Sequence, residues 1–339
     1  MIRLDRFLVV DDTLDGLAAN ERLASLVRAR SGPMMLTVHV GDGADAAAVE
    51  ARLRRPFETA AVRRVEIRVA NAGPAEALLE AHDAYVPGDA PAARALIVPA
   101  WQRGLCVVNT VEQAERVAAF EDESFEPEGT RRWYSLMEGS PTVITNPQHV
   151  VLEHGARINP RVVVSNESAI TIGRGSLLGA DAELNLYRAR FTLGRFCHTS
   201  SYFTAIGSRH TVHFPSTFAV SRGPYAFLGE PADVVGDIVI GNDVWFGTRV
   251  VLLPGARVAD GAIVGAGSVV TESLTEPYGI YAGSPARLIR LRFAPHVVKW
   301  LCAIQWWNWP TRRLWEAREF FRTDLSNKTE DELWRLIGG

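Results

Sequence analysis

A chain of 339 residues is long enough for two domains, and its 36 basic and 39 acidic side chains nearly balance, which argues against a nucleic-acid partner. There is no run of about 18 apolar residues and no charged, apolar leader, so we expect neither a membrane span nor a secretion signal. The three cysteines are widely spaced and odd in number, which argues against a disulfide framework or a zinc cluster and favours a reducing, cytoplasmic location.

The first 125 residues alternate short apolar runs with helical stretches. The apolar runs predict buried strands at 7–10, 35–40, 65–70, 83–86 and 105–108. The intervening stretches, rich in Ala, Leu, Glu and Arg, favour helices over 14–30, 44–54, 74–82 and 111–121. This alternation predicts a Rossmann-like α/β domain over 1–125, built on a small doubly wound parallel sheet. Neither a G-x-G-x-x-G nor a P-loop motif follows any of these strands, so dinucleotide or P-loop chemistry is not supported.

A different period follows the acidic, proline-containing connector that we expect over 126–147. Aliphatic side chains recur every six residues, most regularly in the series Ile240, Phe246, Leu252, Val258, Val264 and Val270. The residue four positions after each is small or β-branched, except Leu274 at the end of the series. A period of six fits neither a helix nor an ordinary strand, but it fits a parallel β-solenoid in which three short strands make one triangular coil. We predict this solenoid over 148–293.

Two segments depart from the repeat. Residues 207–236 interrupt it with a loop that contains aromatic residues and two histidines. Long excursions from a compact domain are commonly functional, so this loop is a candidate for the chemistry. Residues 294–339 are helical by composition and contain six of the nine tryptophans. We expect a helical tail whose aromatic side chains form its packed face.

Four sequence motifs share one family resemblance. They are IGNDVWFG (240–247), LLPGARVADGAIVGAGSVV (252–270), YAGSPARLIRLRF (281–293) and IQWWNW (304–309). Together they resemble the xenobiotic acyltransferase branch of the hexapeptide-repeat acetyltransferases, which includes chloramphenicol, streptogramin and sugar O-acetyltransferases. The resemblance covers about residues 150–320. It implies a left-handed parallel β-helix, a homotrimer, and acetyl-CoA as acyl donor in a groove between neighbouring subunits.

The resemblance also implies a catalytic histidine in the excursion loop. The matching residue is His210, six residues before the segment Ser-Thr-Phe at 216–218, and His213 is the rival. A neutral imidazole suits the role of general base near pH 7. Its orienting partner is open, since Glu230, Asp233, Asp237 or a backbone carbonyl would each serve. The donors for the oxyanion of the tetrahedral intermediate are unassigned.

Small residues in the coils are the candidates for binding the coenzyme. Gly247, Gly265 and Ala266 are what tight coil corners require, and they also leave room for a pantetheine arm. Trp245 departs from the polar exterior expected of a solenoid. Its indole is therefore predicted either to wall the coenzyme groove or to pack against a neighbouring subunit.

The phosphates of the coenzyme require cationic partners. Arg287 stands where the resembling family often has the lysine of an Asn-Pro-Ala-Lys turn, and Ser284 replaces the asparagine. Glu272 stands where a lysine is often found, which puts one phosphate contact in doubt. Arg290 or Arg292 is the candidate to replace that contact.

The expected function is an acetyl-CoA-dependent O-acetyltransferase acting on a sugar or a surface-polysaccharide precursor. The additional N-terminal domain suggests a larger or tethered acceptor, while antibiotic O-acetylation and amino-sugar N-acetylation stay open. A trimeric scaffold without activity is the non-enzymatic alternative. A metal-dependent hydratase of the same architecture needs three converging histidines, and the spacing of His198, His210 and His213 does not fit, so no metal is expected. A sugar nucleotidyltransferase would need a glycine-rich nucleotide loop that the N-terminus lacks.

Overall fold

The structure is a computed structural model of the whole chain. It describes residues 6–10, 21–29, 34–39, 47–48, 51, 65–70, 79, 84–88, 91–103, 105–111, 113–114, 143–144, 146–158, 161–162, 168–210, 212–213 and 234–338. Two compact units are present. One comprises Met1–Glu138, Val150–Arg157 and Ala303–Gly339, and the other comprises Gly139–His149 and Ile158–Cys302.

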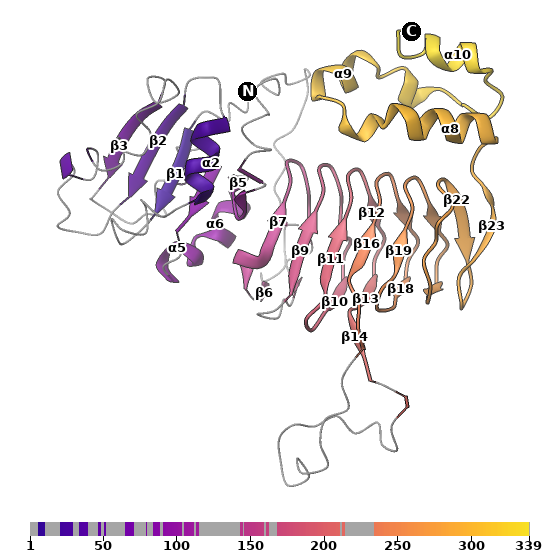
Figure 1. The fold of residues 1–339 in the computed structure, drawn as a ribbon, viewed down its shortest axis with the longest axis horizontal. Helices are drawn as coiled ribbons and strands as arrows, with labels where there is room; N and C mark the ends of the chain where they lie inside the picture. The colour runs from indigo at the N-terminus through magenta and orange to yellow at the C-terminus, as the bar shows by residue number, and fades with distance from the viewer. Residues whose placement is uncertain are drawn as a thin grey trace. The chain divides into compact units, whose positions relative to one another are not determined.

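The N-terminal part of the first unit contains a parallel sheet (Figure 1). Its strands are β1 (Arg6–Val10), β2 (Met34–His39), β3 (Val65–Ala70), β4 (Ala84–Pro87) and β5 (Cys106–Val107), in the order β3-β2-β1-β4-β5. Every neighbouring pair is parallel. The chain therefore adds strands first on one side of β1 and then on the other. Each strand falls on one of the five apolar runs of the sequence.

The helices agree less closely with the sequence. Helix α2 (Glu21–Ala29) lies within the stretch predicted at 14–30. Helices α5 (Pro91–Ala95) and α6 (Ile97–Gln102) were not predicted. The Tyr85 hydroxyl ties α5 to the sheet, because it donates to the carbonyl of Ala93 at 2.6 Å. The helices predicted over 44–54, 74–82 and 111–121 lie largely outside the described residues.

Two buried amides join β5 to strand β7 (Val150–Leu152) within this unit. The Asn109 side chain donates to the carbonyl of Val150, and the Gln113 side chain donates to that of Leu152 at 3.1 Å. Gln113 also accepts from the Asn109 backbone N–H at 2.8 Å. Because buried polar groups are costly unless paired, these bonds fix the position of β7 against the end of β5.

The second unit is a solenoid with three faces (Figure 1). The first face runs β9 (Ala169–Ile172), β11 (Arg190–Leu193), β16 (Ile238–Ile240) and β19 (Arg257–Val258). The second runs β12 (His198–Thr199), β17 (Trp245–Phe246), β20 (Ile263–Val264) and β22 (Gly279–Ala282), and ends in the antiparallel β23 (Arg287–Leu291). The third runs β10 (Glu183–Asn185), β13 (Thr204–Ile206), β18 (Val251–Leu252) and β21 (Val269–Val270). A further parallel pair joins β6 (Val143–Ile144) to β8 (Arg161–Val162).

The solenoid core follows the period of six. All six aliphatic or aromatic residues of the series from Ile240 to Val270 are at most 4% exposed, and the residues four positions later are at most 5% exposed. Positive φ angles recur with the same spacing, at Asp243, Arg249, Gly255, Gly261 and Gly267. The chain therefore turns three residues after each buried side chain, in a left-handed backbone conformation. The three parallel sheets that the period predicts are present.

A shift of two residues in the repeat has a simple cause. Both Ile170 and Ile172 are buried, because β9 is four residues long and its side chains alternate between the core and the outside. Two extra residues return the strand to the same face, so the core pattern survives.

We name the three corners by the faces that they join. The first corner joins the first face to the second, the second corner joins the second face to the third, and the third corner joins the third face to the first. The chain leaves the solenoid at the third corner, after β13, through β14 (Ser208–Arg209). It returns through β15 (Val234–Val235), which pairs antiparallel with β14. This position matches the start and end of the predicted excursion loop.

The C-terminal residues are helical, as the composition predicts. The α-helices are α8 (Pro295–Ile304), α9 (Thr311–Glu316) and α10 (Glu330–Arg335), and 3-10 turns lie at Trp306–Asn308 and Phe320–Arg322. A further 3-10 turn, Pro147–His149, precedes β7. Aromatic pairs hold the tail together, with the rings of Trp306 and Phe321 5.0 Å apart and those of Trp309 and Phe320 6.1 Å apart. No helix in the described part of the chain has the length and apolar character needed to cross a lipid bilayer.

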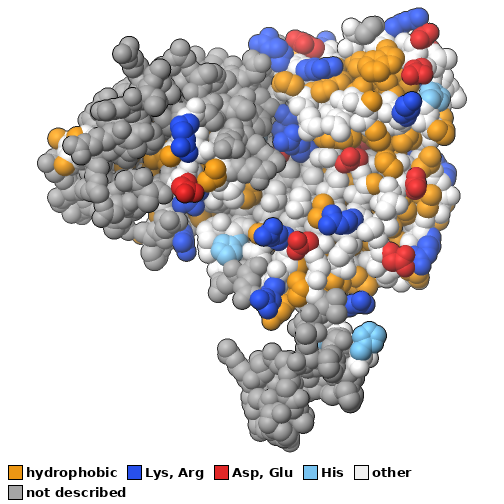
Figure 2. Space-filling model, viewed as in Figure 1, with side chains coloured by type: hydrophobic (Ala, Val, Ile, Leu, Met, Phe, Trp, Pro, Cys, Tyr) orange, Lys and Arg blue, Asp and Glu red, His pale blue; other side chains and the backbone are white. Residues whose placement is uncertain are grey.

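Charges of both signs are interspersed over the solenoid surface that Figure 2 presents. Basic and acidic side chains alternate there with apolar ones. A surface of this kind gives no extended field of one sign, in line with the near balance of charge in the sequence.

Candidate active site

Most of the predicted coenzyme-binding residues lie along one line at the second corner. A Cβ atom on Gly247 would lie 2.5 Å from the Ala266 nitrogen, and one on Gly265 would lie 3.2 Å from the Cβ of Ala282. Ala282 in turn pairs with Arg287 across β22 and β23. We call the five residues Gly247, Gly265, Ala266, Ala282 and Arg287 the glycine strip. It crosses three successive coils and ends at a cation.

The close approach of the coils explains the glycines of the strip. The N–H of Gly247 donates to Val264 at 2.8 Å, and the N–H of Gly265 donates to Tyr281 at 2.8 Å. Both donors therefore belong to the ladder between coils. The absence of a side chain at these glycines lets successive coils stack closely at the corner, and Ala266 is the exposed member beside them.

Trp245 lies on the second face, just before the strip. Its neighbour Phe246 points into the core, so strand alternation directs the indole outward, where it is 49% exposed. In the sheet it lies between His198 and Ile263, and Ile263 pairs with Ile280. The outer row of this face thus places an exposed histidine and an exposed indole side by side.

His210 occupies a different corner. It follows β14 directly, at the start of the excursion loop, and its side chain is exposed, as is that of His213. The third face lies between this corner and the glycine strip. Within one chain, the structure therefore gathers the strip but places the predicted base at the third corner.

The base of the loop is held by polar contacts. Gly207 donates to Asn185 at 2.8 Å, and the carbonyl of Gly207 accepts from Gly236 at 3.0 Å. Asp237, one candidate for orienting His210, accepts from the backbone N–H of Arg190 at 2.9 Å. Its carboxylate therefore anchors the returning chain to the first face. The other two acidic candidates, Glu230 and Asp233, lie outside the described residues.

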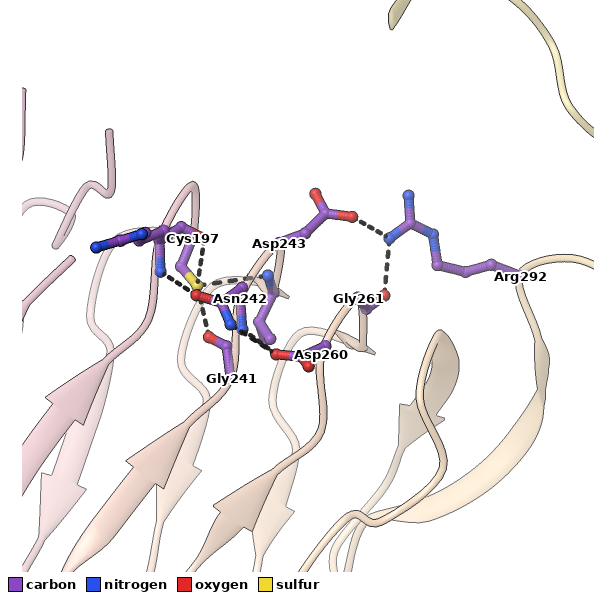
Figure 3. A network of polar contacts seen from close by, with 9 residues as sticks. Cys197, Gly241, Asn242, Asp243, Asp260, Gly261 and Arg292 are labelled. Carbon is purple, nitrogen blue, oxygen red and sulfur yellow. Dashed lines mark hydrogen bonds and ion pairs between the residues drawn. The ribbon is translucent and has the colours of Figure 1, made fainter. Parts of the chain in front are cut away.

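A polar network at the first corner was not predicted (Figure 3). Asn242 donates to the Asp260 carboxylate from its backbone at 2.6 Å and from its side chain at 2.9 Å. Its side-chain oxygen accepts from the backbone N–H of Arg195 at 2.8 Å, which extends the ladder to the preceding coil. These three residues each lie two positions after a buried aliphatic residue. Polar residues at one position of successive repeats are the sequence signal that would have revealed it.

Arg292 belongs to this network as well (Figure 3). Its guanidinium lies 3.0 Å from the Asp243 carboxylate and donates to the Gly261 carbonyl at 2.7 Å. Both charged side chains are about three-quarters buried, with 24% and 25% exposure. Burial raises the pKa of Asp243, and the attraction of Arg292 offsets only part of that rise. Arg292, one of the two candidates for a replacement phosphate contact, is thus engaged at the first corner by Asp243 and Gly261.

Arg287 and Arg290 differ in their surroundings. One Arg287 nitrogen lies 3.9 Å from the Glu272 carboxylate, and another donates to the Ala286 carbonyl at 3.1 Å. Arg290 donates to the carbonyl of Leu291 at 3.0 Å and is exposed. The acidic residue that departs from the resembling family therefore lies beside the arginine predicted to bind phosphate.

Sequence comparisons identify the family of the chain. A family model described as bacterial transferase hexapeptide (six repeats) matches residues 237–272, the most regular coils. A probable macrolide acetyltransferase of Lysinibacillus sphaericus is 33% identical over 147 residues, which are 40% of this chain and 78% of that protein. The chain belongs to the hexapeptide-repeat acetyltransferases of the xenobiotic acyltransferase type.

Two further relatives of this acetyltransferase have different acceptors in their names. A chloramphenicol acetyltransferase of Agrobacterium fabrum is 36% identical over 137 residues, 37% of this chain and 63% of that protein. A galactoside O-acetyltransferase of Escherichia coli is 29% identical over 170 residues, 48% of this chain and 76% of that protein. Each match covers less than half of this chain. Family membership therefore assigns no role to the residues outside the matched segments.

The three histidines that the metal alternative would use lie in the described part of this acetyltransferase. There, no three side chains of His, Cys, Asp or Glu converge as metal ligands would. His198 lies on the second face, whereas His210 and His213 follow the third corner. Within one chain, the topology therefore places these histidines at different parts of the solenoid.

Proposed function

We propose that this chain is an acetyl-CoA-dependent O-acetyltransferase that acetylates a hydroxyl of a sugar or a surface-polysaccharide precursor. The observation that carries the proposal is the glycine strip in a member of this family. The strip is a line of small residues along one corner, with an exposed indole at one end and a guanidinium at the other. A thin, extended pantetheine arm fits such a line, and its phosphates suit the arginine.

The proposed reaction is direct transfer. His210 takes the proton of the acceptor hydroxyl as the oxygen attacks the thioester carbonyl carbon. The tetrahedral intermediate then collapses, the C–S bond breaks, and the CoA thiolate leaves and takes up a proton. The two cysteines whose thiols the structure describes do not suit an acyl-enzyme. Burial raises the pKa of Cys197 to about 12 and also raises that of Cys302, so neither is an activated nucleophile.

The active form in this proposal is a homotrimer of left-handed β-helices, as the family resemblance implies. The separation of His210 from the glycine strip supports it, because one chain presents these elements at two different corners. A neighbouring subunit would bring the base of one chain to the strip of another. Each site then depends on assembly, and an isolated subunit should be inactive.

The acceptor that receives the acetyl group has two candidate classes. The galactoside O-acetyltransferase relative supports a sugar hydroxyl, and the additional N-terminal sheet supports an acceptor larger than a free sugar. Antibiotic O-acetylation is the second candidate, favoured by the macrolide and chloramphenicol relatives. A panel of mono- and oligosaccharides, nucleotide sugars, amino sugars, a macrolide and chloramphenicol, assayed by release of the CoA thiol, separates these classes.

Calorimetric titration with acetyl-CoA tests the donor first. Saturable binding at about one site per chain is the expected result. Absence of binding at millimolar acetyl-CoA would overturn the proposal and favour a scaffold. Binding without turnover on any acceptor of the panel would contradict the acceptor classes named here while leaving the donor in place.

A further inference from the structure

Glu272 and Arg287 are brought together by the backbone. Glu272 follows β21 on the third face, and Arg287 begins β23 on the second. The Ala286 N–H donates to the carbonyl of Val269 at 2.8 Å, which ties the start of β23 to β21. The side chains then meet at the top of the glycine strip, with Arg287 59% and Glu272 73% exposed.

This ion pair adds little to the stability of the fold. Exposed pairs of this kind contribute modestly because water screens both charges. Its larger effect is on ligand binding, because the Arg287 guanidinium ends the strip and lies 3.9 Å from the Glu272 carboxylate. A coenzyme phosphate approaching Arg287 would lie close to Glu272, well within the Debye length of about 8 Å.

We propose that Glu272 weakens the contact between Arg287 and a coenzyme phosphate, and so lowers the contribution of that contact to acetyl-CoA affinity. It is a positioning residue that acts through Arg287, and this inference rests on the proposed use of acetyl-CoA. With Glu272 in place, the guanidinium is partly neutralised, and the chain holds its donor mainly by the pantetheine arm along the strip. Removal of the carboxylate charge frees Arg287 for the phosphate.

Glu272→Gln tests this directly, since the two residues are nearly isosteric and the site is exposed. Calorimetry is carried out with acetyl-CoA, with acetyl-3′-dephospho-CoA and with acetyl-pantetheine, which lacks every phosphate. Glu272→Gln should increase the affinity for acetyl-CoA by about 2- to 5-fold, the range of an exposed charge pair. It should leave acetyl-pantetheine unchanged. The dephospho analogue reports which phosphate Arg287 contacts.

Two controls separate a specific effect from a general one. Glu276→Gln removes the same charge four residues away, from another exposed position, and should leave acetyl-CoA affinity unchanged. In an Arg287→Gln background, Glu272→Gln should lose its effect, because the carboxylate acts through the guanidinium.

The contrary outcomes are distinct. An unchanged acetyl-CoA affinity in Glu272→Gln, an equal change for acetyl-pantetheine, or the same gain in Glu276→Gln would each overturn the role of Glu272. In all three cases acetyl-CoA still binds, so the proposed function stands. Failure of every variant and of the unmodified chain to bind acetyl-CoA would overturn the proposed function itself.

Discussion

The ring of Tyr278 fills the space that a side chain on Gly261 would need. A Cβ at Gly261 would lie well inside van der Waals contact with that ring. Gly261 also has a φ of 71°, a region that side chains disfavour. Tyr278 is itself 1% exposed, and Arg292 lies over its ring at 5.2 Å. The glycine thus lets the last coil close over the first corner.

Gly261→Ala should therefore destabilise the solenoid more than an alanine at another left-handed glycine. Gly267 is the matched control, because its φ is 70° and a Cβ there meets nothing within 4 Å. Gly267→Ala should lower the free energy of unfolding by about 1–2 kcal/mol, the cost of placing a side chain on a left-handed backbone. Gly261→Ala adds displacement of a buried tyrosine. Denaturant unfolding of both variants measures the difference, and equal losses would show that the ring moves without cost.

The repeat made the solenoid predictable. A buried side chain every six residues specifies both the core and the number of faces. The repeat is visible in the sequence because apolar residues occupy this position in every coil. The five N-terminal strands were predictable for a related reason, because buried parallel strands are continuous apolar runs. Helices α5 and α6 were not predicted, because each is too short to show a helical period and α6 contains Pro99.

Contacts between residues far apart in the chain could not be predicted from the sequence. The Asn242–Asp260 ladder links residues 18 positions apart, and the Asp243–Arg292 pair links residues 49 apart. Their partners depend on how coils stack and where β23 returns. The candidate site shows the same limit. Gly247, Gly265 and Ala266 were named from spacing and resemblance, but Ala282 and the pairing of Arg287 with Glu272 required the structure.

The raised pKa of Asp243 predicts a specific pH dependence. A carboxyl whose folded pKa is raised favours the protonated form in the folded state, so its contribution to stability is present below its ordinary pKa of 3.8 and is lost as the pH rises through the folded pKa. Asp243→Asn removes this titration, while Arg292 keeps its bond to Gly261.

We therefore expect the stability of the unmodified chain relative to Asp243→Asn to fall as the pH rises from below 3.8 and then to level off. Denaturant unfolding of both proteins across this range gives the difference. A relative stability that increases with pH would mean that the attraction of Arg292 outweighs burial.

Trp245→Ala should weaken acetyl-CoA binding by about 2- to 10-fold, the range of a single aromatic contact. The effect on thermal stability should be small, because the indole is 49% exposed. Trp315→Ala is the control, since Trp315 is 38% exposed in the C-terminal tail. Calorimetry and thermal melts distinguish the two. A loss of trimers in Trp245→Ala at unchanged affinity would instead assign the indole to the subunit interface.

His210→Ala should reduce turnover on the order of 10²- to 10⁴-fold, as removal of a general base does. The affinity for acetyl-CoA should stay the same, because the general base contacts the acceptor hydroxyl and not the coenzyme. His213→Ala, an exposed histidine in the same loop, should retain near-normal turnover. The opposite ranking of the two variants would transfer the base to His213. Equal, normal rates would remove the loop histidines from the reaction.

Complementation between subunits is the sharpest test of the proposed assembly. Ala266→Trp covers the exposed middle of the glycine strip, and His210→Ala removes the base, so each variant alone should be inactive. If each site combines His210 of one subunit with the strip of the next, every mixed trimer contains one intact site of three. Random reassembly of equal amounts should then recover roughly a quarter of the normal activity.

The control for this experiment is the same mixture without exchange of subunits, which should stay inactive. Mixed trimers in the reassembled sample are verified by native mass spectrometry, which resolves the different masses of the two variants. Sites formed within one chain would give no recovery at all, since every chain carries one defect. Recovery therefore reports a site shared between subunits, and its absence in verified mixed trimers would place His210 and the strip of one chain in the same site.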